Sequence, residues 1–563
     1  MKQDYPVIQC DVLIAGGGSA GVMAAIRAKE LDKDQRVIVL EKGDAKYSGC
    51  IARGMDALNI VSIPGIASPE LYVESNSIAC EGIMDEPPNH MMAQRSYGVM
   101  QRLVDLGVCF PVDENGNYDI LQVHPKGKFC VTMKEPELKT ILHKKMIELG
   151  TEVMNRTMAV ELLKNEDRVT GVIAVNVRTG EICVIQAKSV ILSAGGTARF
   201  GLPNNGNLYG VYDFPGNTGD GYCMAYRAGA ELSGFEYTLT YYIVKDINAP
   251  LLYITLTRGA HLYDAYGNRK DKEHPSLRSL NYEDVINRSG PLRITMDHLE
   301  EETIAEIENL LFTTERPACE RFYEGRGINF RNPGSDGEIE LWGTEVFLCG
   351  GHGITGVRVN EKAETSVRGL YAAGDTSLVA RGHLSGAFVY GEISAESATE
   401  FAHTVDHCEV DTGAVDRFLA KRAARLAQSD NPIAIEEFEY KVRRIINDYL
   451  RAPKNEYKLK RALWWMKRFR EELSTMVYIK DMHDLFKSYE LENIIQCAVL
   501  SATASLERKE SRWLPWHYRT DFPETDNERW LKHIVLTQGE HPDDVVVAHK
   551  EIIRMAKEEL TNA

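Results

Sequence analysis

The sequence contains no closely spaced pair of cysteines. Eleven cysteines are spread along 563 residues, and no two of them are near enough to form a CxxC or CxxxxC pair. This spacing excludes a local zinc or iron–sulfur site and the paired thiols of disulfide-reducing enzymes, and the odd number argues against a secreted disulfide framework. We therefore expect reduced cysteines in a cytoplasmic protein and no metal site within the chain.

Positive charge and long apolar runs are also scarce. The chain has 65 Lys and Arg residues against 82 Asp and Glu, which gives a net charge of −17. A protein with this excess of acid repels nucleic acid and anionic membranes. No stretch approaches 18 uninterrupted apolar residues, and the start has neither a signal-peptide nor a twin-arginine pattern. These absences argue against nucleic acid binding and membrane insertion, and favour a small molecule or another protein as partner.

A glycine-rich motif opens the chain. Residues 16–21 read GGGSAG and satisfy G-x-G-x-x-G. The pattern predicts a buried strand at Val12–Ala15, a helix from Ala20 and a second buried strand at Val37–Leu40. In such a unit the glycines let the backbone approach a pyrophosphate, the helix N-terminus offers free N–H groups, and a later carboxylate accepts hydrogen bonds from a ribose. We predict a dinucleotide site formed by Gly16, Gly18, Ser19, Ala20, Gly21 and Glu41.

Two later strand-turn segments favour FAD over NAD. Residues 189–196 read SVILSAGG and residues 369–375 read GLYAAGD. Both end in small residues, where a strand can meet a long, extended cofactor. An NAD site with one fingerprint would not need them.

Together these segments resemble the flavoprotein subunits of the succinate dehydrogenase, fumarate reductase and L-aspartate oxidase superfamily. The resemblance is carried by the fingerprint, the SAGG turn, the NTGDG segment at 217–221, GLYAAGD, and KESRWLPWHYRTDFPETD near the end of the sequence. It spans nearly the whole chain. It implies FAD as cofactor, with further contacts from Lys42, Ser48, Gly49, Ala194, Gly195, Asp220, Asp375 and Ser385.

Several details are similar to the alpha subunit of adenylylsulfate (APS) reductases. Residues 46–54, KYSGCIARG, are similar to RSGAVAxG of that subunit, at the place where the membrane-bound relatives carry a flavin-attaching histidine. The resemblance therefore implies non-covalent FAD. HMMAQRSYGVMQRLVDLGV, Trp513 and the GHLSG segment at 382–386 are also APS-reductase-like, although this chain is shorter than that subunit usually is.

The fold expected is α/β, with three parts. A Rossmann-like FAD-binding domain is discontinuous and covers 1–234 and 342–407. Between its halves the sequence becomes aromatic, charged and rich in turns, which predicts an inserted α+β capping domain at 235–341. After residue 407 the pattern is almost wholly helical, which predicts a C-terminal helical domain at 408–563.

A cap-domain arginine delivers a proton in fumarate reductases. The segment LTRGAHLYDAYGNR at 256–269 resembles the segment that carries it, with two residues removed, and puts Arg258 at that position. An arginine can act as an acid only beside a carboxylate relay in a closed site. In this sequence the position of that carboxylate is occupied by Leu256 or Thr257, neither of which is acidic. Substrate contact, proton delivery and a cap-domain salt bridge therefore all stay open for Arg258.

Two dicarboxylate-binding histidines of the superfamily are replaced. Their positions fall near Tyr241 and Val346, which argues against plain fumarate chemistry because a short dianion needs donors at both ends. His352, Arg381 and His383 remain as candidate catalytic residues. Either histidine could carry a proton, bind an anion or cap its own loop.

We predict an FAD-dependent oxidoreductase that performs two-electron chemistry on a small anionic substrate at the interface of flavin and cap. Arg258, Arg381 and His383 would neutralise that substrate. Because the chain has no cysteine cluster, a separate ferredoxin-like subunit with [4Fe–4S] clusters would exchange electrons with it, in a hetero-oligomer. Three alternatives stay open: APS-reductase-type sulfur-oxyanion chemistry, a stand-alone enzyme like L-aspartate oxidase or fumarate reductase, and a non-catalytic flavin electron relay.

One basic segment interrupts the acidic sequence. Arg451–Arg470 contains eight basic residues and one acid, a local charge of 8 − 1 = +7. It is either a surface helix whose Leu463, Trp464 and Met466 pack on the body, or a docking face for an acidic electron-transfer partner.

Overall fold

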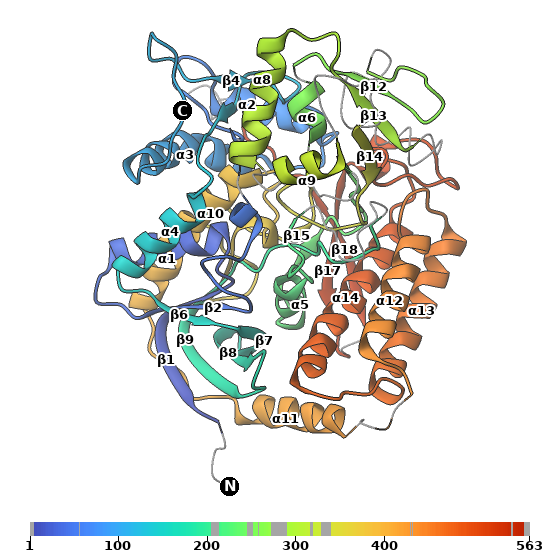
Figure 1. Ribbon diagram of the computed structural model, residues 1–563. Coiled ribbons are helices and arrows are strands. Elements are labelled where there is room, and N and C mark those ends of the chain that lie inside the picture. The colour runs from blue at the N-terminus through green and yellow to red at the C-terminus, as the bar shows by residue number, and fades with distance from the viewer. Residues whose placement is uncertain are drawn as a thin grey trace.

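The computed structural model (Figure 1) describes residues 5–53, 55, 57–203, 213–244, 251–256, 258–271, 290–315, 319–327, 339–427, 430, 432–541 and 544–556. All structural statements concern these residues. In Figure 1 the N-terminal sheet and its helices lie on the left, the elements between β11 and β14 lie at the top, and the last helices form the right-hand side.

A seven-stranded sheet is the centre of the fold. Its order is β6-β2-β1-β9-β8-β7, and a seventh strand, β16, also pairs with β9. The pairs among β6, β2, β1, β9 and β16 are parallel, whereas β7, β8 and β9 pair antiparallel. The strands are β1 (Val7–Ala15), β2 (Val37–Glu41), β6 (Glu152–Asn155), β7 (Thr157–Asn165), β8 (Arg168–Asn176), β9 (Ile182–Leu192) and β16 (Leu370–Ala372).

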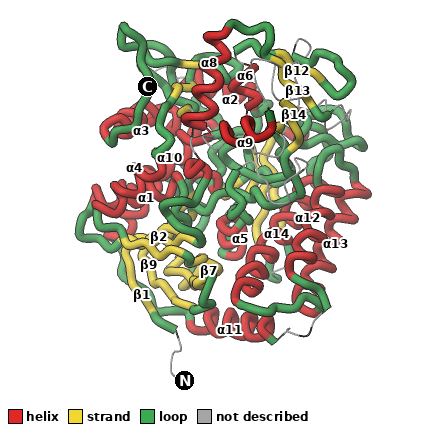
Figure 2. The backbone as a smooth tube through the Cα atoms, viewed as in Figure 1, coloured by secondary structure: helices red, strands yellow, loops and turns green. Residues whose placement is uncertain are grey.

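Both faces of this sheet are buried, as its apolar strands require. Along β1, Leu13 and Ala15 belong to one hydrophobic cluster, whereas Val12 and Ile14 belong to another on the opposite face. Helices cover one face, and later helices of the chain cover the other (Figure 2). The helices of the first group are α1 (Ser19–Leu31), α3 (Glu86–Asp105), α4 (Leu138–Glu148) and α10 (His383–His403).

Short elements connect the sheet to its surroundings. They are η1 (Cys50–Arg53), β3 (Ala57–Leu58), α2 (Pro69–Ala79), β4 (Ile120–Leu121), β5 (Cys130–Thr132), α5 (Asp220–Arg227) and η3 (Gly374–Thr376). Strands β3, β5 and β4 form a small antiparallel sheet of their own.

The described cap has its own sheet and its own core. Its four antiparallel strands follow the order β11-β14-β13-β12. The buried residues of its hydrophobic cluster all lie between Tyr242 and Leu341. Its elements are β11 (Tyr242–Val244), α6 (Leu251–Leu256), β12 (His261–Tyr263), β13 (Leu292–Thr295), α8 (Glu301–Asn309), a π-helical turn (Leu310–Glu315), α9 (Cys319–Arg326) and β14 (Ile339–Gly343).

The last part of the chain begins with four helices but ends in strands. The helices are α11 (Thr412–Leu426), α12 (Ile435–Tyr449), α13 (Glu456–Thr475) and α14 (Met482–Glu507), followed by the short α15 (Asn527–Trp530). Strands β17 (Lys532–Gln538) and β18 (Val545–Glu551) then form an antiparallel hairpin. The expected C-terminal helical domain is confirmed, but its last part is a hairpin, because KHIVLTQ and VVVAHKE are rich in the β-branched residues that favour strands.

This hairpin joins the C-terminal part to the rest of the protein. β17 pairs with β10 (Leu232–Ser233), which in turn pairs with β15 (Gly356–Val357). The part of the chain around the central sheet, which contains β10 and β15, and the C-terminal part, which contains β17 and β18, therefore share a four-stranded sheet, β15-β10-β17-β18. Although α14 has 26 residues, none of the helices in the described ranges is long and apolar enough to cross a membrane.

Helix α13 contains most of the basic segment. Met466 is fully buried and Leu463 is partly buried against the main core. Trp464 is 48% exposed, and Arg461 lies over its ring at 4.4 Å. Packing therefore accounts for Leu463 and Met466, whereas Trp464 faces outward, and a docking role for this helix stays a prediction.

A buried carboxylate joins α14 to the part of the chain around the central sheet. Glu490 of α14 accepts hydrogen bonds from Lys42, which follows β2, and from Arg199. Burial on its own would raise the pKa of Glu490, but the charges of Arg199, Lys42 and Lys487 outweigh it and lower the pKa to about 2.

Glu490→Gln should destabilise the protein by about 3 kcal/mol at neutral pH, because it leaves several buried cations without their shared carboxylate. Because the pKa is lowered from 4.5 to about 2, this stabilisation is fully present above pH 4.5 and is lost progressively as the pH falls from there toward 2. Urea unfolding at pH 7 and at pH 4 measures both effects. The exposed Glu471→Gln on α13 is the matched control and should change stability by less than about 0.5 kcal/mol; equal effects of the two variants would contradict the assignment.

Candidate functional site

Four parallel strands end at the same edge of the central sheet. β1, β2, β9 and β16 run in one direction, so the residues that follow each of them meet there. These residues line an open cavity of about 1130 Å³, including its part open to solvent. A cavity of this size at this edge suits a long ligand such as a dinucleotide.

The glycine turn after β1 is built by close backbone contacts. Gly16 has a φ of +113°, and a Cβ atom there would lie 2.4 Å from the carbonyl oxygen of Ser193, after β9. A Cβ atom at Gly21 would lie 1.9 Å from the carbonyl oxygen of Gly16. Side chains cannot be accommodated at these distances, so glycine is required at both positions.

Helix α1 points its N-terminus at the cavity. Gly18 is its N-cap, and no side chain caps it. A Cβ atom at Gly18 would meet no atom within 4 Å, because the residue faces the cavity. The first N–H groups of the helix are thus available to an anionic group such as a pyrophosphate.

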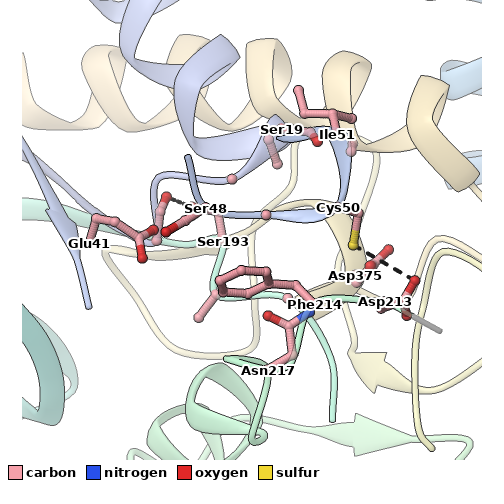
Figure 3. A pocket seen from close by; sticks show the side chains of 18 of the residues that line it. Ser19, Glu41, Ser48, Cys50, Ile51, Ser193, Asp213, Phe214, Asn217 and Asp375 are labelled. Atoms are coloured by element: carbon pink, nitrogen blue, oxygen red, sulfur yellow. Dashed lines mark hydrogen bonds between the residues drawn. The ribbon is translucent and has the colours of Figure 1, made fainter. Parts of the chain in front are cut away.

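Glu41 and the pair Asp213 and Asp375 lie toward opposite ends of the cavity (Figure 3). The Glu41 carboxylate is held in place by the N–H groups of Gly17, at 2.9 Å, and Gly43, at 2.7 Å. Lys139 also supports the turn: it is 3% exposed and donates to the carbonyl of Gly17. The sequence did not predict this lysine, because no local motif marks it.

Most of the predicted cofactor-binding residues line this cavity, namely Gly16, Gly18, Ser19, Ala20, Glu41, Lys42, Ser48, Gly49, Ala194, Gly195, Asp220 and Asp375. Two do not. Gly21 lies within α1 and packs on Gly16, and Ser385 lies within α10 and donates its hydroxyl to the carbonyl of Asn59. The structure therefore brings the predicted set together, with Gly21 and Ser385 supporting its wall.

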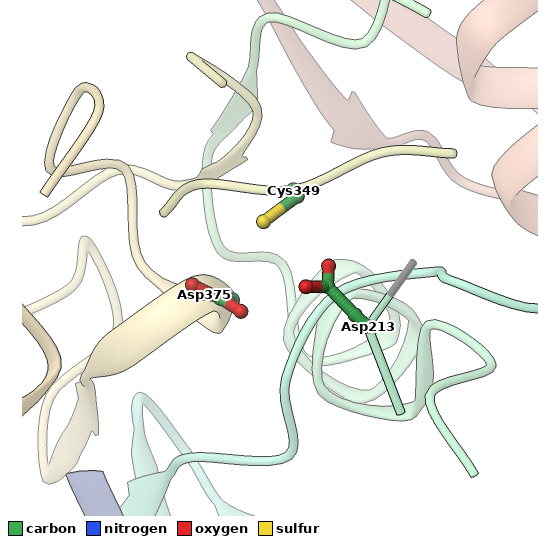
Figure 4. A group of neighbouring side chains, drawn as sticks. All are labelled: Asp213, Cys349 and Asp375. Atoms are coloured by element: carbon green, nitrogen blue, oxygen red, sulfur yellow. The ribbon is translucent and has the colours of Figure 1, made fainter. Parts of the chain in front are cut away.

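Three acidic or thiol groups gather near one end of the cavity (Figure 4). Ligand atoms of Asp213, Cys349 and Asp375 lie within 4.8 Å of one another. Burial, and then the charge of Asp213, raise the pKa of Asp375 to about 6. Burial also raises the pKa of Cys349 far above its ordinary value. Because metal ligands must be deprotonated, these shifts oppose metal binding.

Two predicted histidines lie beside this group. His352 and His383 both line the cavity, with ring centroids 5.1 Å apart in an edge-to-face arrangement. Nε2 of His352 lies 3.6 Å from Oδ1 of Asp213. Burial lowers the pKa of both histidines, and for His383 the shift is large. Both rings are therefore neutral at neutral pH.

Backbone hydrogen bonds fasten the two histidine loops together. The N–H of Arg381 donates to the carbonyl of Gly353 at 2.8 Å, and that of His383 donates to Gly351 at 3.0 Å. Arg381 and His383 have φ values of +52° and +49°. Non-glycine residues adopt this left-handed conformation at a cost of about 1–3 kcal/mol, which concentrates at functional sites.

Arg381 itself does not line the cavity but lies beside the residues that do. Burial is the main cause of the pKa shifts of five neighbouring side chains, and the charge of Arg381 acts on each of them. It adds to the lowering of the histidine pKa values and opposes the raising of the tyrosine pKa values; the side chains are Tyr72, His124, Tyr241, His352 and His383. Among the residues that the structure describes, the guanidinium has no hydrogen bond or ion pair.

Arg258 lies in the cap. Its Nε and Nη2 are each 2.8 Å from Oε1 of Glu306 on α8, and its Nη1 donates to the carbonyl of Ile254 at 3.1 Å. The expected relay position Thr257 lies outside the described residues, as does Gly54. The residues that line the described cavity do not include Arg258, so its roles in substrate contact and proton delivery stay predictions.

The two positions that replace superfamily histidines have different surroundings. The hydroxyl of Tyr241 donates to the carbonyl of His352 at 3.2 Å, so this side chain adjoins the site. Val346 is fully buried in the main hydrophobic cluster. Tyr241 can contribute to ligand recognition, whereas Val346 serves packing.

Comparisons with known proteins agree with this geometry. Residues 11–390 match the FAD binding domain family, and residues 439–559 match the family described as fumarate reductase flavoprotein C-term. An uncharacterized FAD-dependent oxidoreductase of Methanocaldococcus jannaschii is 26% identical over 94% of this chain and 96% of its own length. The fumarate reductase (CoM/CoB) of Methanothermobacter marburgensis has one subunit that is 26% identical over 95% and 98% of the two chains.

Solved structures share the fold over almost the entire chain. Adenylylsulfate reductase of Archaeoglobus fulgidus superimposes with a TM-score of 0.88 at 22% identity, covering 98% of both chains. The quinol fumarate reductase flavoprotein of E. coli superimposes with a TM-score of 0.83 at 16% identity, again over 98% of both. With the FAD binding domain match covering more than half of its sequence, this protein belongs to the succinate dehydrogenase and fumarate reductase family of FAD-dependent oxidoreductase flavoproteins.

Proposed function

We propose that the protein performs two-electron chemistry on a small anionic substrate, bound between the flavin and the cap, and exchanges electrons with a separate ferredoxin-like subunit that carries [4Fe–4S] clusters. The observation that carries the proposal is the unpaired guanidinium of Arg381 next to His352 and His383. A site with one uncompensated cation and neutral hydrogen-bonding rings suits an anionic ligand.

Several buried arginines of this chain are compensated by carboxylates. The pairs are Arg199 with Glu490, Arg508 with Glu236, Arg512 with Glu510 and Arg519 with Asp521. Arg381 is partly buried, and withdrawing a charge from water without a partner is unfavourable. The loop that holds Arg381 in a left-handed conformation without such a partner is therefore best explained by an anion that binds from outside the chain.

The cavity residues fit FAD in an extended arrangement. Glu41 would hold the adenosine ribose, and the N-terminus of α1 at Ser19 and Ala20 would hold the pyrophosphate. Gly195 and Asp375, after β9 and β16, would hold the flavin half. The isoalloxazine supplies the electron chemistry when it is bound.

The side chains of this protein would then position the substrate and handle its protons. Arg381 would fix the anionic group. Neutral imidazoles can both donate and accept a proton, so His383 and His352, which line the cavity, would supply or take up the proton that accompanies electron transfer.

The need for a separate electron carrier follows from the sequence. The chain has no CxxC pair for a cluster of its own, and it has one dinucleotide fingerprint, which FAD would occupy. Among its relatives, the Methanothermobacter marburgensis protein is by name one of the subunits of its enzyme, which supports a place for this chain in a hetero-oligomer.

Gly21→Ala should remove bound FAD, because the new Cβ atom would lie 1.9 Å from the Gly16 carbonyl and displace the turn. The ratio of flavin to protein absorbance after gel filtration measures the loss. Gly98→Ala is the matched control, since Gly98 lies on α3 and a Cβ atom there meets nothing within 4 Å. Full FAD content in folded Gly21→Ala protein would refute the placement of FAD in this cavity.

Arg381→Gln should weaken the binding of small anions to the FAD-loaded protein by about tenfold or more, since it removes a charge-assisted contact. Arg381→Lys should retain part of the affinity. Titration of the flavin absorbance spectrum with glycolate, fumarate and sulfite measures the dissociation constants. Arg178→Gln, an exposed position, is the control; unchanged affinities in Arg381→Gln would rule out the proposed anion site.

Under anaerobic conditions a reduced two-cluster [4Fe–4S] ferredoxin should bleach the flavin, and NADH should not, because the chain has no second nucleotide fingerprint. Stopped-flow absorbance measures both rates, with dithionite as the reference for full reduction. Rapid bleaching by NADH together with no reaction with ferredoxin would reverse the assignment of the electron donor.

A further inference from the structure

A third histidine lies next to the two that line the cavity. His124, in the segment between β4 and β5, is 5% exposed. Its ring packs edge-on against Tyr72 and Phe129, with both pairs of centroids 5.7 Å apart. On another side it lies 6.3 Å from the ring of His383. His124, His383 and His352 therefore form a row that ends at the cavity.

Three ring nitrogens in this row have no partner. Nδ1 and Nε2 of His124 and Nδ1 of His383 are buried without a hydrogen bond. An unpaired buried donor or acceptor costs about 1–3 kcal/mol, and such groups in native proteins are normally satisfied by water or a ligand. Three together, beside an unpaired Arg381, indicate a group that is supplied from outside the chain.

These nitrogens offer neutral hydrogen bonds and no charge. Burial lowers the pKa of His124 to about 3, and the charge of Arg381 acts in the same direction. His383 is neutral for the same reason. A neutral imidazole presents one donor and one acceptor. Its natural complement is a group that can also do both, such as a hydroxyl.

Within the part of the chain that the structure describes, one cation beside the histidine row, Arg381, is available to a ligand. Lys42, which lines the cavity, is paired with Asp220 at 2.7 Å and Glu490 at 3.0 Å. Arg258 in the cap is paired with Glu306. A dianion bound beside the histidine row would therefore have one compensated charge and one uncompensated charge, which is costly in a buried site.

We propose that His124 and His383 bind a neutral donor–acceptor group of the substrate while Arg381 binds its one anionic group. The substrate class is thus a monoanion that carries a hydroxyl or similar group close to its acidic group. This inference rests on the proposed function, because it assumes that the anion site at Arg381 exists.

The test uses the FAD-loaded protein and matched probes that differ by one hydroxyl group: acetate and glycolate, and propionate and lactate. Dissociation constants come from perturbation of the flavin absorbance spectrum. Wild-type protein should bind the hydroxylated member of a pair about tenfold more tightly, the value of one good hydrogen bond. His124→Phe, which fits the aromatic surroundings, should abolish this preference and leave acetate affinity unchanged. His124→Gln should keep part of it.

The controls separate this inference from the proposed function. Arg381→Gln should weaken both members of each pair, and the exposed His541→Phe should change neither. If no probe binds, or if Arg381→Gln has no effect, the proposed function fails. If Arg381→Gln weakens binding but His124→Phe keeps the hydroxyl preference, only the role of His124 fails. The proposed role of His124 is also overturned if the wild-type protein binds both members of every pair equally.

Two further outcomes complete the test. Succinate should bind no more tightly than propionate, and about tenfold tighter binding of this dianion would overturn the single anionic group. If His124→Phe does not retain FAD, His124→Asn and His383→Phe replace it. Loss of the hydroxyl preference in either variant supports the proposal, and retention in both overturns it.

Discussion

Backbone contact between the turn after β1 and the turn after β9 is the constraint on which the site depends. The two strands are parallel neighbours, and a Cβ atom at Gly16 would collide with the carbonyl of Ser193. Because this contact admits no side chain, both turns can lie directly beneath one cavity. The same contact fixes the start of α1, and with it the end of that helix that can bind an anion.

Charge is distributed around this cavity in two ways. Toward the C-terminal helices, the charges of Lys42, Arg199 and Glu490 compensate one another and join α14 to the central sheet. Beside the two cavity histidines, Arg381 has no such partner within the described residues and lies among neutral rings. The first arrangement is what a structural ion pair network requires. The second is what a ligand site requires, and it distinguishes Arg381 from the arginines that serve stability.

The sequence pattern predicted those features of the site that depend on residues close together in the chain. The strand at Val12–Ala15, the helix from Ala20 and the carboxylate Glu41 all lie where the spacing placed them, because each depends on a few neighbouring residues. His124 could not be predicted this way, since one histidine in a loop has no motif and its meeting with His383 depends on the whole fold. The same holds for Glu306, which reaches Arg258 from α8.

Gly16 and Glu490 have a common consequence for how the protein is made. The glycine turn lies within the first 21 residues and the turn that it contacts follows β9 at Ser193, but β16 and α14, which finish the cavity, come from the last 40% of the sequence. Long-range contacts of this kind form late and slow folding. A nascent chain therefore displays an unfinished cavity edge while most of the protein is still being synthesised. Stable capture of FAD must wait until α14 has left the ribosome and Lys42 has found its carboxylate.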